Sequence, residues 1–90
     1  MKKIEVYEVD GEGLASMLGE RVLLMCANFY YEGDLVGVNN DCVLLEDAGI
    51  VYSTGEWSEK TWGDRQQLPG PHYVMTQAIE SFCKSPAAVL

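Results

Sequence analysis

The chain has 90 residues, of which 48% are apolar, and this is enough for one hydrophobic core but not for two domains. Its formal net charge of −8 comes from 14 acidic and 6 basic residues, and neither sign is gathered into a run or a tail. Because clustered Lys and Arg supply most of the non-specific affinity for phosphates, this composition excludes a general electrostatic binder of DNA or RNA.

The N-terminal part of the chain contains one helix signal. Residues 2–9 mix apolar and acidic residues without a clean alternation, so a short strand and an extended arm both stay open. In the following LASML, the apolar residues have the i, i+3, i+4 spacing of about one and a half helical turns. Gly19 is well placed to end such a helix. We therefore predict a short helix over residues 13–19.

Three apolar runs follow, separated by two very short polar or small breaks. The runs are residues 22–25, 30–38 and 43–45, and the third is expected to continue to Tyr52. Short runs rich in Val, Leu and Tyr with such breaks are typical of antiparallel strands joined by hairpins. The sequence therefore predicts three strands within residues 20–52.

Two glycines in the middle run predict a strong bend. Gly33, Leu35 and Gly37 are two residues apart, so in a regular strand they point to the same face. Glycine weakens a strand and is found where a sheet bends sharply or where another backbone comes close. A small, strongly bent antiparallel sheet is therefore expected.

The C-terminal half contains one long loop and two further strands. Residues 53–71 are polar, with three glycines and two prolines, which predicts a loop. Strands are predicted at residues 72–75 and 78–82, and residues 84–90 are expected to form a frayed tail. Because no internal repeat and no domain boundary is visible, we expect residues 1–90 to form a single domain.

Residues 19–48 resemble the Sm1 motif of Sm and LSm proteins. In that motif, a Gly and an apolar strand lead to G-x-L-x-G, followed by an Asp, an Asn and a strand that ends in acidic residues. GDLVG at residues 33–37 and EDA at residues 46–48 stand at the matching positions. Residues 73–82 (YVMTQAIESF) are similar in length and apolar pattern to the second motif, Sm2. The resemblance covers most of residues 13–83.

This resemblance implies a mainly β, Sm-like fold: a short N-terminal helix and a strongly bent, five-stranded antiparallel barrel of the SH3-like kind. It also implies a homo-oligomeric ring, in which residues 73–76 of one copy pair with residues 78–82 of the next. Ring closure would satisfy the two edges of an open sheet and add to a small core, whereas in a monomer the same side chains would fill the core. The candidate subunit-interface residues are Tyr73, Val74, Met75, Ala78, Ile79 and Phe82.

The resemblance also implies a site for single-stranded RNA. In Sm-type rings, an Asp in the first loop orients an Asn that reads the base edge, and an Arg-Gly pair in the second loop completes the pocket. Here Asn39 replaces the Asp, and Cys42 aligns with the Asn in a loop one residue shorter, although Asn40 can take this role in a shifted register. Thr76-Gln77 replaces the Arg-Gly pair. The candidate RNA-binding residues are Asn39, Asn40, Asp41, Thr76 and Gln77.

Two interpretations of these loops stay open. Uncharged amides and a hydroxyl can line the central opening and read unstacked bases. Alternatively, residues 39–41 form only a tight turn, because Asn and Asp tolerate left-handed backbone. The corresponding functions are a ring that binds single-stranded RNA or takes part in RNA processing, and a protein-interaction ring that has lost RNA binding.

Trp57 and Trp62 in the long loop are candidate partner-binding residues, because exposed Trp anchors protein partners or stacks on bases. Alternatively, both rings fold back over the barrel. His72 has no Asp or Cys at the spacing of a metal site or triad, and no glycine-rich phosphate loop exists. We therefore expect that the protein is not an enzyme and has no cofactor and no metal. The expected partners are further copies of the chain, single-stranded RNA or a protein. Binding to a membrane or to duplex DNA is not expected.

The cysteines and the apolar runs indicate the compartment. Cys26, Cys42 and Cys83 form no CxxC pair and leave one residue over in any disulfide scheme, which is typical of buried thiols in a reducing compartment. No apolar run has the length needed to cross a membrane. A cytoplasmic protein is therefore expected.

Overall fold

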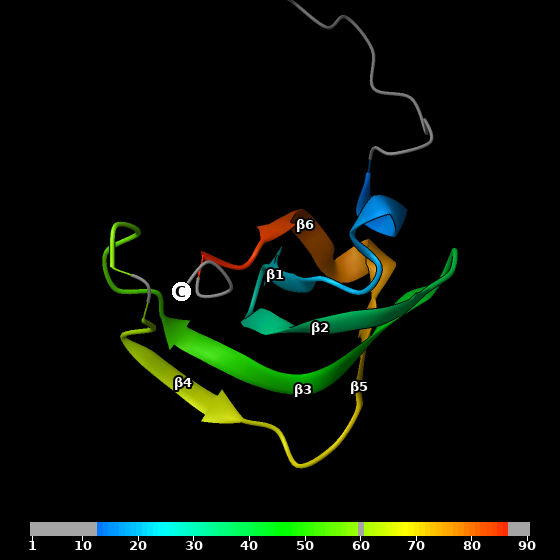
Figure 1. Cartoon of the computed structure of the whole chain (residues 1–90). Helices are drawn as coiled ribbons and strands as arrows, with labels where there is room; N and C mark the ends of the chain where they lie inside the picture. The colour runs from blue at the N-terminus through cyan, green and yellow to red at the C-terminus, as the bar shows by residue number, and fades with distance from the viewer. Residues whose placement is uncertain (1–12, 60, 87–90) are drawn as a thin grey trace, which may run out of the picture.

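The computed structural model describes residues 13–59 and 61–86, which form one antiparallel sheet with two short 3₁₀ turns (Figure 1). The predicted mainly β, antiparallel architecture is confirmed. Residues 2–9, for which a strand or an arm was predicted, lie outside the described residues. The elements in chain order are η1 (Leu14–Met17), β1 (Arg21–Cys26), β2 (Tyr30–Val38), β3 (Cys42–Ser53), β4 (Asp64–Gln67), β5 (His72–Met75), η2 (Thr76–Ala78) and β6 (Ile79–Lys84).

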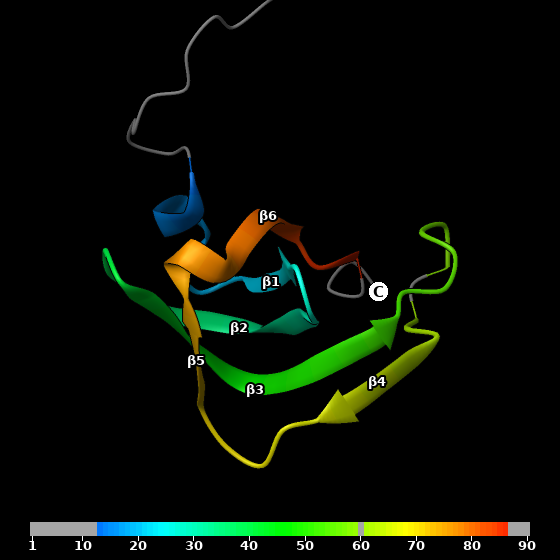
Figure 2. The ribbon, with the colours of Figure 1, turned by 180° about the vertical axis from the view of Figure 1, so that it is seen from behind.

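The third strand organises the sheet. The strands are ordered β4-β3-β2-β1-β6, and β5 pairs separately with β3. The two ends of β3 have different partners, since residues 42–45 pair with β5 and residues 49–53 pair with β4. Figures 1 and 2 show β3 curving along β2 between these two partners. The long third strand therefore carries the sheet around the core.

The bend lies beside the glycines of β2. The register between β2 and β3 shifts twice, once before and once after Leu35. On β3 the first shift lies at Asp47, whose φ of 49° is left-handed. A Cβ at Gly33 would lie 3.0 Å from the Cα of Ala48, so the two backbones come very close here. The close backbone approach predicted at these glycines is thus confirmed at Gly33, and the two shifts are bulges of the kind that increase twist.

The core lies inside the curve of the sheet. It is built from the apolar residues of β1, β2, β3 and β5, and the partly buried Leu14 and Met17 of η1 pack against it. Since each fully buried Val or Leu contributes about 1.5–3 kcal/mol, this cluster supplies most of the driving force for the fold. Its members are Val22, Leu24, Cys26, Leu35, Val43, Leu45, Ala48 and Val74.

The helix predicted over residues 13–19 is wrong in kind. Only Leu14–Met17 is helical, as a single 3₁₀ turn, and the described residues contain no α-helix. The segment has no side-chain cap and is bracketed by Gly13 and Gly19, whose φ angles of 81° and 87° are left-handed. A stretch this short cannot offset the cost of helix nucleation, so packing against the core decides its conformation.

The prediction of a five-stranded barrel is also wrong. The sheet has six strands and stays open, because β5 and β6 each pair with only one described strand. The additional strand, β4, lies inside the predicted loop of residues 53–71. Its sequence, DRQQ, contains no apolar alternation, so no strand pattern is visible in it. Tertiary contacts of Arg65, described below, hold β4 on the sheet instead.

The predicted tail of residues 84–90 starts too early. Lys84 ends β6, and Ser85 is 1% exposed because its hydroxyl donates to the buried carboxylate of Glu32. Residues 87–90 of the predicted tail lie outside the described residues. Among the described residues, no helix is long and apolar enough to cross a bilayer.

Candidate functional site

The two loops predicted to bind RNA lie against each other. The hydroxyl of Thr76 donates to the backbone carbonyl of Asn40 at 2.8 Å, and the Thr76 amide donates to the carbonyl of Asp41 at 2.9 Å. These contacts join the β2–β3 turn to the start of η2, although 36 residues separate them. The structure therefore brings the predicted residues together in one polar surface, here termed the loop face: Asn39, Asn40, Asp41, Thr76 and Gln77.

Within the loop face, Asn39 has a structural role. Its side-chain Oδ1 accepts hydrogen bonds from the amides of Asp41 at 2.7 Å and Cys42 at 2.9 Å, which closes the β2–β3 hairpin. The turn interpretation therefore holds for Asn39, whose side-chain oxygen is not free for a ligand. By contrast, the side chains of Asn40 and Gln77 are exposed, and no described residue hydrogen-bonds to either.

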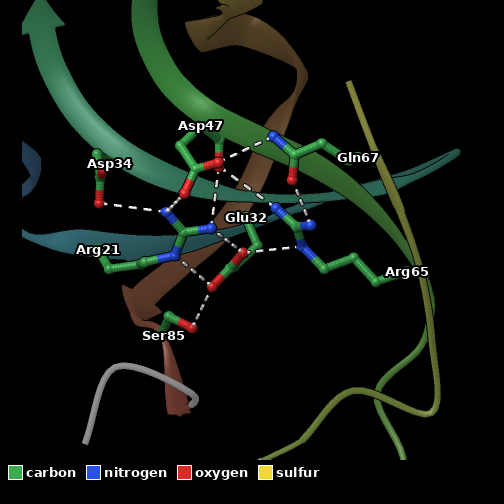
Figure 3. Close-up of polar contacts among 7 residues, drawn as sticks. All are labelled: Arg21, Glu32, Asp34, Asp47, Arg65, Gln67 and Ser85. Atoms are coloured by element: carbon green, nitrogen blue, oxygen red, sulfur yellow. Dashed lines mark hydrogen bonds and ion pairs between the residues drawn. The ribbon is translucent and has the colours of Figure 1, made fainter. Parts of the chain in front are cut away.

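Glu32 lies at the centre of a buried ion-pair network that the sequence analysis missed (Figure 3). Its side chain is 2% exposed, and Arg21 donates to its Oε2 and Oε1 from Nε and Nη2, both at 2.8 Å. Nε of Arg65 donates to Oε1 at 3.0 Å, and the Ser85 hydroxyl donates to Oε2 at 2.9 Å. Each carboxylate oxygen thus accepts two hydrogen bonds, which offsets the desolvation of the charge.

Asp47 extends this network onto β3. Its carboxylate accepts hydrogen bonds from Arg21 at 3.0 Å and Gln67 at 2.9 Å, and its carbonyl accepts from Arg21 at 2.9 Å and Arg65 at 3.3 Å. Any Cβ at Gly49 would overlap the guanidinium of Arg65, so the glycine makes room for it. The side chains of β4 therefore fasten this strand to Glu32 and Asp47, and the network is structural.

One feature of the sequence could have pointed to this network. A carboxylate inside the nine-residue apolar run of β2 must be desolvated and so needs a buried cation. The identity of that cation was hidden, because Arg65 is 33 residues away in a segment without a strand pattern.

The network also removes cations from the surface. Burial acts to lower the pKa of Arg21, but hydrogen bonds and charge from Glu32, and then from Asp34, outweigh burial and raise the pKa. On β6, Lys84 pairs with Glu20 at 3.1 Å. In the part of the chain that the structure describes, every arginine and lysine therefore has an acidic partner.

A groove of about 470 Å³ lies between the β1–β2 hairpin and the segment formed by β5, η2 and β6. One wall of the groove contains Phe29 of the hairpin, which is 43% exposed. The other wall contains Tyr73 and Met75 of β5, which are 65% and 57% exposed. Gln77 of the loop face also lines the groove. The groove and the loop face are therefore adjacent.

Phe29 belongs to an aromatic cluster. Its ring makes edge-to-face contacts with Tyr31 and Tyr52, at centroid distances of 6.4 and 6.1 Å. Tyr31 in turn stacks on His72 at 5.2 Å, with an interplanar angle of 24°. These contacts hold the exposed ring of Phe29 in place, and they pack His72 of β5 against Tyr31 of β2.

The candidate interface residues divide according to their side of the sheet. Val74 belongs to the core and Ile79 packs against it, as in the monomer alternative. Tyr73 and Met75 point away from the core and are exposed. Ala78 and Phe82 are also exposed. Four of the six predicted interface residues are therefore available for contact with another chain.

The two tryptophans lie in the β3–β4 connection. Trp57 is exposed and Trp62 is half-buried, and both line a shallow depression together with Pro86. The alternative interpretation required both rings to fold back over the core. The side chains packed against the described core do not include them.

We expect stability to fall in alkaline solution because of two thiols, the buried Cys26 and the partly buried Cys83. Burial raises the pKa of Cys26, and the charge of Glu80 raises it further; burial also raises the pKa of Cys83. Above the ordinary value of 9.0, the unfolded chain loses these protons while the folded chain keeps them. The free energy of unfolding should therefore decrease as the pH rises through 9 towards the raised pKa values. Urea denaturation between neutral pH and about pH 10 measures this, and Cys26→Ala should flatten the decrease.

No protein-family model, no curated protein and no solved structure matches this chain.

Proposed function

We propose that this protein is a cytoplasmic, Sm-like ring subunit that binds short single-stranded RNA on its loop face. The observation that carries the proposal is the contact of Thr76 with Asn40 and Asp41, which joins the two loops that Sm-type rings use. The exposed amides of Asn40 and Gln77 each offer a donor and an acceptor for a base edge. The three free thiols are in keeping with a reducing compartment.

Assembly into a ring is the second part of the proposal. Within the described residues, β5 and β6 each have one unpaired edge, and Tyr73, Met75 and Phe82 expose apolar surface on these strands. Pairing of residues 73–76 in one copy with residues 78–82 in the next would satisfy both edges and cover these side chains. The loop faces of successive copies would then repeat around one opening.

Such a site would recognise bases rather than phosphates. Every described arginine and lysine has an acidic partner, so few counterions are released when RNA binds. The affinity should therefore come from hydrogen bonds to unstacked bases, which gives a base preference and a shallow dependence on salt.

Changing the loop face should weaken RNA binding. We expect Asn40→Ala and Gln77→Ala each to raise the Kd for a short oligo-U or oligo-A by roughly three- to tenfold, the value of a lost hydrogen bond. Fluorescence anisotropy on nuclease-treated protein, titrated with salt, measures this. Gln66→Ala, which changes an exposed amide on β4 away from the loop face and the groove, is the matched control and should leave the Kd unchanged.

The same samples test the ring by sedimentation, where the wild-type chain should sediment as a closed oligomer. An absence of RNA binding by the wild-type protein even at low salt, or an equal loss in Gln66→Ala, would contradict the RNA proposal. A monomer at all concentrations would contradict the ring.

A protein-interaction ring is the second candidate function, and the charge of the molecule favours it. A subunit of net charge −8 whose described cations are all paired repels a polyanion. A protein partner with a basic surface would instead be attracted to this acidic subunit.

A further inference from the structure

The groove between the β1–β2 hairpin and the segment of β5, η2 and β6 has fixed aromatic and apolar walls. The ring of Phe29 is held by Tyr31 and Tyr52 but remains 43% exposed. Met75 and Tyr73, which are more exposed still, line the opposite wall. A fixed, exposed ring can bind an apolar chain or a cation without first losing conformational entropy.

The described residues give this groove charge of a single sign. Glu80 lines the groove and is exposed, and no described residue forms an ion pair with it. Among the residues that the structure describes, no lysine or arginine lines the groove. The charge of Glu80 acts on the hairpin wall as well, since it is the second cause, after burial, of the raised pKa of Cys26. An uncompensated carboxylate beside aromatic rings favours a cationic ligand.

The size and lining of the groove narrow the choice of cation. Its volume of about 470 Å³ exceeds that of a single ammonium group, and apolar side chains make up much of the wall. Lysine and arginine combine an apolar stem with a charged end, so the stem can lie along Phe29 and Met75 while the charge reaches Glu80. Apolar neighbours in the ligand would cover the rest of the wall.

We propose that this groove binds a protein partner through a lysine or arginine side chain flanked by apolar residues. The inference goes beyond RNA binding on the loop face and holds whether or not RNA binds there. Because the proposed ring contact would cover Tyr73 and Met75, the groove is open only on a copy whose β5 is not paired with a neighbour. The partner and the neighbouring copy therefore compete for this wall.

The test uses the full-length, ¹⁵N-labelled protein and the blocked peptide acetyl-Leu-Lys-Leu-amide, with norleucine in place of lysine as the neutral control. We expect the lysine peptide to shift the amide signals of Phe29, Tyr31 and Glu80 and to bind more tightly than the norleucine peptide. Glu80→Gln should abolish the difference between the peptides, and Phe29→Leu should weaken lysine binding roughly two- to fivefold. Glu46→Gln, another exposed carboxylate, is the matched control and should change neither value.

Three outcomes would overturn the inference. Equal binding of the norleucine peptide would mean that the groove is only apolar. Shifts of the same signals on raising the protein concentration without peptide would identify a second copy as the occupant. If an oligonucleotide but neither peptide shifts the groove signals, the groove binds RNA. The signals of the loop face are recorded in the same spectra, so this result is distinguishable from RNA binding at Asn40.

Discussion

Replacing Glu32 with glutamine should lower the free energy of unfolding by about 3 kcal/mol, as expected for a buried ion pair that loses one partner. Glu32→Gln keeps the shape of the side chain but removes the negative charge between the guanidinium groups of Arg21 and Arg65. These groups are 22% and 18% exposed, so water and Asp47 would compensate for only part of the loss. For a domain of this size, the melting temperature should fall by roughly 12–24 °C.

The measurement is urea denaturation followed by tryptophan fluorescence. Asp34→Asn is the matched control, because Asp34 also contacts Arg21, at 3.3 Å, but is 48% exposed; its loss should cost less than about 1 kcal/mol. Native-state hydrogen exchange should show β4 opening more easily in Glu32→Gln, since Arg65 no longer fastens this strand. Equal losses of unfolding free energy in Glu32→Gln and Asp34→Asn would contradict the prediction that the buried charge of Glu32 contributes more to stability than an exposed one.

Replacing Gly33 with alanine should destabilise the fold by about 2 kcal/mol, within the range for overpacking in a close-packed interior. The new Cβ would lie 3.0 Å from both the Cα of Ala48 and the carbonyl oxygen of Glu46, and these are backbone atoms that cannot rotate away. The close approach of β2 and β3 at the first bulge would therefore have to open.

Gly37→Ala is the matched control on the same strand. Its Cβ would meet only the Cβ of Leu44, at an ordinary 3.4 Å, so alanine fits and restricts the unfolded chain. We expect Gly37→Ala to be neutral or to stabilise by up to about 1 kcal/mol. Thermal unfolding of both variants checks the difference, and similar losses in the two would refute the bulge at Gly33 as the cause.

The loop face shows how far local pattern extends towards a site. The asparagines of the β2–β3 turn were recognisable from residue type, and Asn39 does cap that turn. That residues 76–77 would share a site with this turn was implied by the family resemblance. The observed contact of Thr76 with Asn40 depends on β5 pairing with the first half of β3. The aromatic groove was not predicted at all, because its two walls come from parts of the chain that are about 40 residues apart, residues 26–31 and 72–80.

The sequence by itself determined the antiparallel, mainly β class and the positions of most strands. β2 and β5 have the predicted bounds of residues 30–38 and 72–75, because apolar runs between short polar breaks are properties of neighbouring residues. Gly33 likewise indicated a sharp bend or a close approach of two backbones. Glycine weakens a strand and is therefore found in a strand interior mainly where one of these is needed.

Only the tertiary structure decided the rest. β4 exists because Arg65 reaches a buried carboxylate on β2, and the N-terminal segment is a 3₁₀ turn because packing overrides weak local propensity. Whether the sheet closes depends on where β5 and β6 lie at the two ends of the curve. The bulge that places Asp47 opposite Gly33 and the second bulge at Val36 set that curve. These outcomes follow from contacts between residues that are distant in sequence. A local sequence pattern contains no information on the energy of such contacts.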